Sequence, residues 1–232
     1  MKGKRGLLEG RFFQGISRET LDFLWEEGRV EEFEKGCVIF RAGERPAWVY
    51  IQLTGKSMIY NLTHEGRRKI IFIFGSGILL NEHVENSRDS SCYCEMIDKS
   101  RVLVISSATF LGRMGEDFGL AKAVLVMQEW KMWRLCHQLK NTLGSIGLER
   151  KLAAKLWKLS RDFGVKREDG IEIDLNMPVT FLADILGTPR ETASRLCTVL
   201  AGHGLIKMRK KRIVITNPQG MAAFYKTGKI EK

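Results

Sequence analysis

The chain has 232 residues, 44% of them hydrophobic, and carries 38 Lys and Arg against 27 Asp and Glu, a formal net charge of +11. This composition supports a folded core and excludes a disordered chain. No apolar run reaches the ~18 residues of a membrane span, and no secretory signal follows the basic start. Five scattered cysteines indicate no disulfide framework, so we expect a cytoplasmic protein.

The positive charge is concentrated in the C-terminal part of the chain. Residues 145–232 hold 17 basic and 9 acidic residues, whereas residues 1–144 hold 21 and 18. A folded segment with this excess typically faces a polyanion, because each Lys or Arg near a phosphate releases condensed counterions. An ordinary solvated basic surface is the alternative that charge alone leaves open.

The N-terminal part predicts a short helix followed by a β-rich domain. Residues 17–25 (SRETLDFLW) begin with a Ser and predict an amphipathic helix. Between residues 30 and 107, short runs rich in β-branched and aromatic residues alternate with glycine turns. This spacing is typical of an antiparallel barrel or sandwich.

Beyond Thr109 the apolar period becomes helical and predicts one long helix over residues 116–141. One apolar face contains Ala121, Leu125, Met132, Leu135 and Leu139, and an adjoining face contains Val126, Trp130 and Trp133. A stripe this wide exceeds what one subunit's surface needs, so we expect a dimer seam, with burial inside one domain as the alternative. Gly144 and Gly147 then predict a hinge.

The C-terminal part predicts a helix-turn-helix. A helix over residues 148–162 and a strand over residues 171–175 precede a short helix that Thr180 is expected to cap and Gly187 to end. A second helix is expected to begin with a capping box, with Thr188 as N-cap, Pro189 at the first helical position and Glu191 at the third.

A basic hairpin completes this segment. Residues 207–212 (KMRKKR) lie between the apolar residues Leu205-Ile206 and 213–215, which predicts a two-stranded ribbon with a basic tip. Two helices joined by a glycine turn and followed by such a ribbon make a winged helix-turn-helix.

The start of the second helix carries polar side chains on one face. These residues are Arg190, Glu191, Ser194 and Arg195. In the major groove, an Arg donates in a fork to guanine and a Glu accepts from the cytosine amine, so this face predicts base readout. Solvated arginines beside a Glu that serves only the capping box are the alternative.

The run 182–196 (LADILGTPRETASRL) closely resembles the recognition motif of the cyclic-AMP receptor protein and FNR family of bacterial transcription regulators. The order of parts is similar over nearly the whole chain. The resemblance implies an α+β chain with an N-terminal antiparallel β-roll, of the cyclic-nucleotide-binding or jelly-roll type, in residues 1–115. A dimerisation helix and hinge follow in residues 116–144, and a C-terminal winged helix-turn-helix domain in residues 145–232.

The resemblance also implies partners and roles. It implies a homodimer that binds double-stranded DNA at a two-fold symmetric operator, acts on RNA polymerase and responds to a small-molecule effector in the β-roll. By this resemblance Arg190, Glu191 and Arg195 contact bases, Ser194 can join them, and Thr180 and Thr192 touch phosphates. The wing residues expected to bind phosphates without sequence preference are Lys207, Arg209, Lys210, Lys211 and Arg212.

The sensor half departs from the best-known members of that family. A cyclic-nucleotide pocket there needs a Gly-Glu for the ribose and an Arg-Ser pair for the phosphate. Here Glu82 can stand in for the acidic residue, but Ser90, followed by Ser91, occupies the position of the phosphate-binding Arg, and Arg88 lies two positions away. We therefore take Glu82, Arg88, Ser90 and Ser91 as candidate pocket residues, and we expect an effector other than cyclic AMP, which the sequence does not identify.

We predict no cofactor, metal site or catalytic residue. The closely spaced N-terminal cysteines of the FNR cluster are missing. Cys92 and Cys94 alternate on a predicted strand, which favours buried cysteines over a redox pair or a metal site with His83. No catalytic triad, phosphate loop or metalloprotease motif is present, so we expect a regulator and no enzyme. The alternative is a non-enzymatic ligand-binding module whose winged helix docks a protein partner, but the basic wing favours DNA.

Overall fold

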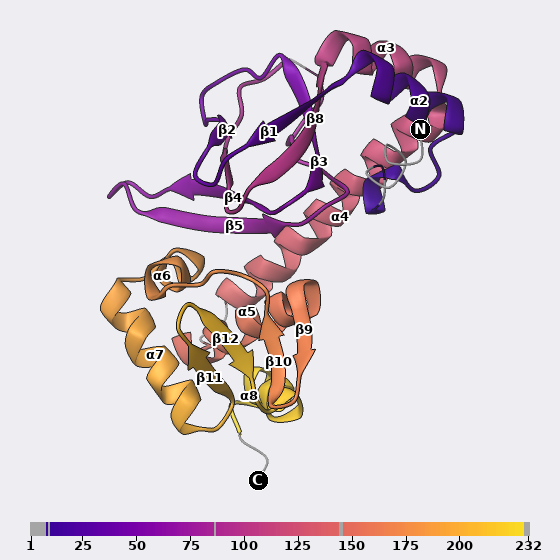
Figure 1. The fold of residues 1–232 in the computed structure, drawn as a ribbon. Helices are drawn as coiled ribbons and strands as arrows, with labels where there is room; N and C mark the ends of the chain where they lie inside the picture. Colours follow the sequence, from indigo (N-terminus) through magenta and orange to yellow (C-terminus); the bar gives the residue numbers. More distant parts are fainter. Residues whose placement is uncertain (1–7, 9, 86, 144–145, 230–232) are drawn as a thin grey trace. The chain divides into compact units, whose positions relative to one another are not determined.

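The computed structural model describes residues 8–229 apart from residues 9, 86 and 144–145 (Figure 1). The described residues form two compact units. One contains the chain through Asn61 together with Ile70–Cys136, and the other contains Leu62–Lys69 and the chain from His137 onward. The predicted α+β class is confirmed: an antiparallel strand domain precedes a long helix, and a winged helix-turn-helix follows.

The described strands of the N-terminal domain form two four-stranded sheets, ordered β1-β8-β3-β6 and β2-β7-β4-β5. One cluster of buried side chains draws on both sheets, including Ile51 of β3, Phe74 of β5 and Cys94 of β7. The alternation predicted from the sequence is thus that of a sandwich with a common core. The strands are β1 (Arg29–Phe33), β2 (Val38–Phe40), β3 (Trp48–Thr54), β4 (Ser57–Leu62), β5 (Arg68–Phe74), β6 (Ile78–Leu79), β7 (Tyr93–Met96) and β8 (Ser100–Ser106).

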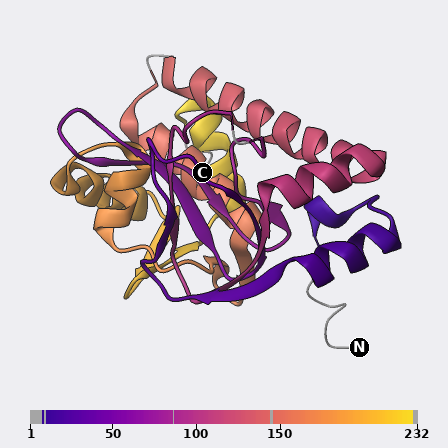
Figure 2. The same cartoon turned by 90° about the horizontal axis from the view of Figure 1, so that it is seen from above.

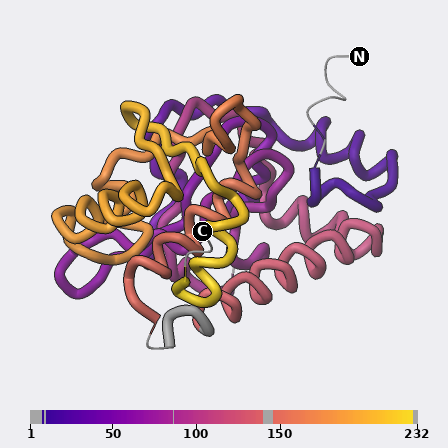
Figure 3. Tube along the Cα trace, turned by 90° about the horizontal axis from the view of Figure 1, so that it is seen from below, coloured from indigo at the N-terminus to yellow at the C-terminus, as the bar shows by residue number. Residues whose placement is uncertain are grey.

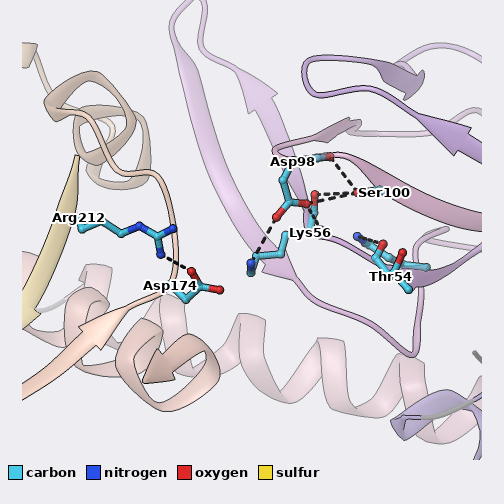
Figure 4. A network of polar contacts seen from close by, with 7 residues as sticks. Thr54, Lys56, Asp98, Ser100, Asp174 and Arg212 are labelled. Atoms are coloured by element: carbon cyan, nitrogen blue, oxygen red, sulfur yellow. Dashed lines mark hydrogen bonds and ion pairs between the residues drawn. The ribbon is translucent and has the colours of Figure 1, made fainter. Parts of the chain in front are cut away.

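The turn between β3 and β4 requires glycine. Gly55 has a φ of +82°, and a Cβ there would lie 2.3 Å from Ser100 Oγ and 2.6 Å from the Lys99 carbonyl oxygen. Beside it, Lys56 donates its backbone N–H to Asp98 and forms a 3.3 Å ion pair with the same carboxylate (Figure 4). The turn is therefore fixed against the turn between β7 and β8.

Helices α2 (Arg18–Glu27), α3 (Ser107–Glu116) and α4 (Phe118–Leu143) meet at one corner of this unit, after a short 3₁₀ turn η1 (Arg11–Phe13). The predicted helix over residues 17–25 is confirmed, and Ser17 Oγ caps it by accepting the Thr20 N–H at 3.2 Å. The helix predicted from residue 116 begins instead at Phe118, because Asp117 is extended and separates α3 from α4. The Asp117 carboxylate accepts hydrogen bonds from the hydroxyls of Ser17 and Thr20, which ties α2 to the start of α4. Figure 2 shows this corner from above.

The two long faces of α4 differ in polarity. The buried stripe contains Leu120, Ala123, Val124, Met127, Lys131 and Arg134. The large apolar side chains exposed on the helix are Phe118, Leu125, Val126, Met132, Trp133 and Leu139. The predicted seam was therefore partly wrong, because Trp130 and Leu135 pack against the core of their own unit. Two cations lie within the buried stripe, and this shifted the apparent phase of the apolar pattern.

The second unit is built around α5 (Leu148–Phe163), which packs against α7 (Arg190–Gly202) and α8 (Pro218–Thr227) (Figure 3). Its sheet has the order β11-β12-β10-β9. The helix predicted over residues 148–162 and the strand near residue 171 are confirmed. The sequence did not predict β9, whose residues are all exposed and lack apolar alternation, or α8. The remaining elements are β9 (Gly164–Arg167), β10 (Gly170–Ile173), α6 (Val179–Leu186), β11 (Ile206–Arg209) and β12 (Arg212–Ile215).

None of the described helices is both long enough and apolar enough to cross a membrane. The predicted hinge residue Gly144 lies outside the described residues, and Gly147 is the N-cap residue of α5.

Candidate nucleic-acid interface

A tight turn sets α7 against α6. Gly187 adopts φ +70°, a left-handed conformation that glycine favours, and its N–H donates to the Ala183 carbonyl at 2.7 Å. The small side chains of Ala183 and Ala193 are buried, as are those of Leu182 and Leu196. The turn predicted at Gly187 is confirmed, and the buried face of α7 leaves its opposite face to solvent.

The outer face of α7 carries the predicted readout residues. The side chains of Arg190, Glu191, Ser194 and Arg195 are all exposed. Within the described part of the chain, none of these four side chains has a hydrogen-bond or ion-pair partner. Two guanidinium groups and one carboxylate are therefore exposed to solvent on the first two turns of α7. In the major groove an Arg can donate to guanine and a Glu can accept from the cytosine amine, so these groups suit G·C base pairs.

The predicted capping box is absent. Pro189, which is extended, is the N-cap residue of α7, so Glu191 is the second helical residue and not the third. Thr188 Oγ1 is buried without a partner among the described residues, so it caps nothing. The reason is the short α6–α7 turn, in which both Gly187 and Thr188 donate their N–H groups to Ala183. Glu191 is therefore free of the capping role that competed with base readout.

The two threonines predicted to touch phosphates differ in exposure. Thr180 is exposed in the first turn of α6, but Pro178 is the N-cap residue there, so the predicted capping role of Thr180 was wrong. Thr192 is half-buried on α7. Both hydroxyls lie near helix N-termini, where backbone N–H groups attract anions.

The basic hairpin is confirmed as a two-stranded ribbon, but its cations fall into two groups. Strands β11 and β12 pair from Ile206 with Ile215 to Arg209 with Arg212, and Lys210 turns the chain with a φ of +53°. The exposed side chains of Lys207, Lys210 and Lys211 have no ion-pair partner among the described residues.

Carboxylates hold both wing arginines. Arg209 forms a 2.7 Å ion pair with Asp169, and Arg212 pairs with Asp174, as Figure 4 shows. Both carboxylates belong to the preceding hairpin, Asp169 in the β9–β10 turn and Asp174 just after β10. The sequence indicated five equivalent phosphate-binding residues. In the structure the three lysines have no ion-pair partner among the described residues, whereas the two arginines are each paired with an aspartate.

The candidate effector residues are brought together, but they bind one another. The Glu82 carboxylate accepts the Ser91 N–H at 2.7 Å, the Ser91 hydroxyl, and the Ser90 hydroxyl at 3.2 Å. Burial alone would raise the pKa of Glu82, but the hydrogen bonds from Ser91 and its neighbours outweigh it and lower the pKa. Arg88 is exposed, and its carbonyl bonds the His83 ring at 2.8 Å.

The cysteines near this loop are buried, as the favoured interpretation expected. Cys92 is 6% exposed and Cys94 is fully buried. Burial raises the pKa of Cys92 to about 11 and that of Cys94 still further, so both are thiols at neutral pH.

Two buried cations were not predicted from the sequence, Lys131 and Arg134, which are 7% and 8% exposed on α4. Burial lowers the pKa of Lys131 from 10.5 to about 7. Their spacing from Met127 and Val124 follows the i, i+3, i+4 rule for one face, which is the signal that could have found them. Charged residues are rarely found in the buried stripe of a helix.

Two family models match the chain. The Crp-like helix-turn-helix domain matches residues 150–224, and the cyclic nucleotide-binding domain matches residues 30–117. The global nitrogen regulator of Synechococcus elongatus is 27% identical over 203 residues, which cover 84% of this chain and 88% of the relative. The fumarate and nitrate reduction regulatory protein of Salmonella typhimurium is 24% identical, over 84% of this chain and 78% of the relative.

Solved structures share the fold. A CooA mutant from Carboxydothermus hydrogenoformans superposes with a TM-score of 0.75 at 17% identity, over 90% of this chain and 97% of that one. The c-di-GMP-responsive global regulator CLP of Xanthomonas campestris gives a TM-score of 0.77 at 19% identity, over 87% of this chain and all of that one.

Proposed function

The chain belongs to the Crp/Fnr family of transcription regulators, and from this premise we propose that it reads base pairs with α7 and grips phosphates with its wing lysines. It is a sequence-specific DNA-binding regulator with an effector-controlled β-roll, and it is not an enzyme. RNA polymerase is the second partner we propose, since a regulator of transcription acts on polymerase access or recruitment. Bacterial DNA lies in the cytoplasm, which is the proposed place of action.

One observation carries the assignment of the reading face. Arg190, Glu191 and Arg195 are exposed on α7 and have no partners among the described residues. The wing arginines differ, because Arg209 is paired with Asp169 and Arg212 with Asp174. Unpaired forks beside an unpaired carboxylate fit a G·C pair, with guanine facing an Arg and the cytosine amine facing Glu191.

A homodimer would present two such helices. The exposed apolar side chains of α4, including Leu125, Met132 and Trp133, support a two-fold seam along this helix. Two reading helices related by a two-fold axis bind half-sites one helical turn apart, about 34 Å, so the operator has the same symmetry.

An unbiased DNA selection with the purified full chain tests this function. We expect enrichment of two-fold symmetric sites with G·C pairs in each half-site, centred 10–10.5 base pairs apart. The variant Arg195→Ala, selected in parallel, should lose discrimination at one base pair of each half-site. If the wild type enriches no sequence above the random pool, base readout is wrong, and the module that docks a protein partner becomes the better account.

The effector we propose differs from cyclic AMP. A relative from Mycobacterium tuberculosis, 19% identical over 93% of this chain, is named a cAMP-activated regulator. In this chain Ser90 stands at the phosphate position, and Glu82 is occupied by Ser90 and Ser91. Micromolar binding of cyclic AMP in calorimetry would contradict the proposal.

A further inference from the structure

The exposed face of α7 continues beyond the residues that the sequence predicted for base readout. Thr198 is exposed, and it follows Glu191 by seven residues. With 3.6 residues per turn it therefore lies within about 20° of Glu191 around the helix axis, between Ser194 and Arg195. Thr198 thus belongs to the same face as the proposed reading residues, about 10 Å further along the helix than Glu191.

Small residues lie next to Thr198 along this face. Ser194 precedes it by one turn, Ala201 and Gly202 follow it by one turn, and all three are exposed. None of these three residues has a side chain long enough to hold α7 away from a surface that the helix meets. The helix can therefore come close to base edges here, so that a side chain as short as that of Thr198 makes contact with them.

The hydroxyl of Thr198 is already used within α7. It donates to the Ser194 carbonyl at 3.3 Å, four residues back in the same helix. A hydrogen bond of this kind fixes the rotamer of a threonine and turns its oxygen towards the helix backbone. The methyl group is therefore the part of the Thr198 side chain that is left to contact a base.

We propose that Thr198 is a specificity-determining residue that recognises thymine by contact with its 5-methyl group. This inference rests on the proposed function, because it adds one base pair to the half-site that α7 reads. Among the four bases only thymine presents a methyl group in the major groove, and the methyl group of a threonine is one of the apolar groups that contact it.

The position of Thr198 on the helix also limits where this thymine lies. The arginines and Glu191 suit G·C pairs, so the contact made by Thr198 adds an A·T pair at a fixed place in each half-site. Three base-pair steps span about 10 Å, the distance along α7 between Glu191 and Thr198. The A·T pair therefore lies within about three steps of the pair that Glu191 reads.

A uracil scan of the selected DNA site tests the inference on the full chain. Each thymine is replaced singly by deoxyuridine, which removes the 5-methyl group and keeps the base pairing, and the affinity is measured by fluorescence anisotropy. We expect one thymine in each half-site at which uracil weakens binding about fourfold, the value of one buried methyl group.

Two variants separate a methyl contact from a hydrogen bond made by the hydroxyl. Thr198→Ser keeps the hydroxyl and should bind the thymine and uracil sites equally. Thr198→Val keeps a methyl group and should retain the fourfold preference for thymine. The inference is overturned if no thymine responds to uracil, if the response survives Thr198→Ser, or if Thr198→Val abolishes it.

A matched control is Thr227→Ser on α8. Thr227 is also exposed, and its hydroxyl donates to the Ala223 carbonyl at 3.0 Å with the same four-residue spacing, so this change should leave the uracil response unaltered. The DNA selection separates failure of this inference from failure of the proposed function. A wild-type chain that enriches a symmetric site without a uracil-sensitive thymine contradicts only the role of Thr198, whereas enrichment of no site contradicts the proposed function.

Discussion

Helices α7 and α4 both bury one face, but they differ in where they place cations. In α7 the arginines face solvent, and Ala193, Leu196 and Leu200 face the core. In α4 Lys131 and Arg134 are buried, while Met132 and Trp133 face solvent. The first arrangement is stable by itself, because charge stays in water and apolar area is buried. The second leaves large apolar side chains in water, which the proposed second subunit would cover.

The largest difference between the two helices should be in how replacing a cation with methionine changes the free energy of unfolding. Burial holds the pKa of Lys131 at about 7 in the folded chain, against 10.5 for a solvated lysine. Below pH 10.5 the unfolded chain gains a proton on Lys131 that the folded chain does not take up until about pH 7. The free energy of unfolding therefore falls as the pH drops from 10.5 to 7, and this loss is constant below pH 7. We expect Lys131→Met to raise the free energy of unfolding at pH 7 by about 1–4 kcal/mol, since it removes a buried charge at the expense of one hydrogen bond to the Asn81 carbonyl.

Denaturant unfolding of Lys131→Met and of the wild type between pH 7 and 10.5 checks this prediction. The difference between them should shrink as the pH rises. The corresponding change on α7, Arg195→Met, should move stability by less than about 0.5 kcal/mol because that side chain is exposed. Equal effects at the two positions, or a difference that does not change with pH, would show that Lys131 carries no burial cost.

Lysines introduced on the exposed face of α4 should weaken the dimer more than lysines introduced on the exposed face of α7. The double variant Met132→Lys and Trp133→Lys places two ammonium groups on the proposed seam, which should cost several kcal/mol of dimer stability. Light scattering at micromolar concentration should show a dimer for the wild type and a monomer for the variant. A control pair on α7, Ser194→Lys and Thr198→Lys, should leave the dimer intact. A wild-type monomer at this concentration contradicts the seam.

The smallest expected effect concerns the paired cations of the wing. Asp174→Asn releases Arg212 from its carboxylate and adds one open cation to the ribbon. Binding to any DNA sequence should tighten modestly, and the dependence of log K on log salt should become steeper by about 1. The matched variant Glu172→Gln releases Arg167 on the outer hairpin and should change the slope less. If both variants leave the slope unchanged, the arginines of the wing do not contact phosphates.

Local pattern predicted much of this structure, including the strand domain, the winged helix and the exposed polar face of α7. What it missed depends on distant residues. Asp169 and Asp174 meet the wing arginines from 40 and 38 positions away, so no spacing rule indicates the pairs. The capping box failed because the two N–H groups of the α6–α7 turn both use the Ala183 carbonyl.

The polarity of α4 could not be predicted from hydrophobic period alone. Both of its faces are largely apolar. The apolar residues from which the sequence predicted a dimer seam lie mostly on the solvent-exposed face. Lys131 and Arg134 gave no sign of burial in the sequence, because buried cations are rare. Only the positions of Phe74 and Asn81, which come from strand β5 and the loop beyond β6, show that this face is covered.

Base readout by α7 is the central claim, and one comparison of two variants tests it most directly. Affinities of Arg195→Ala and Lys210→Ala are measured for the selected site and for random DNA over a range of salt concentrations. Arg195→Ala should cost about 1–3 kcal/mol at the selected site alone. Lys210→Ala should weaken both DNAs alike and make the salt slope shallower by about 1. If both variants weaken selected and random DNA equally, α7 does not read bases.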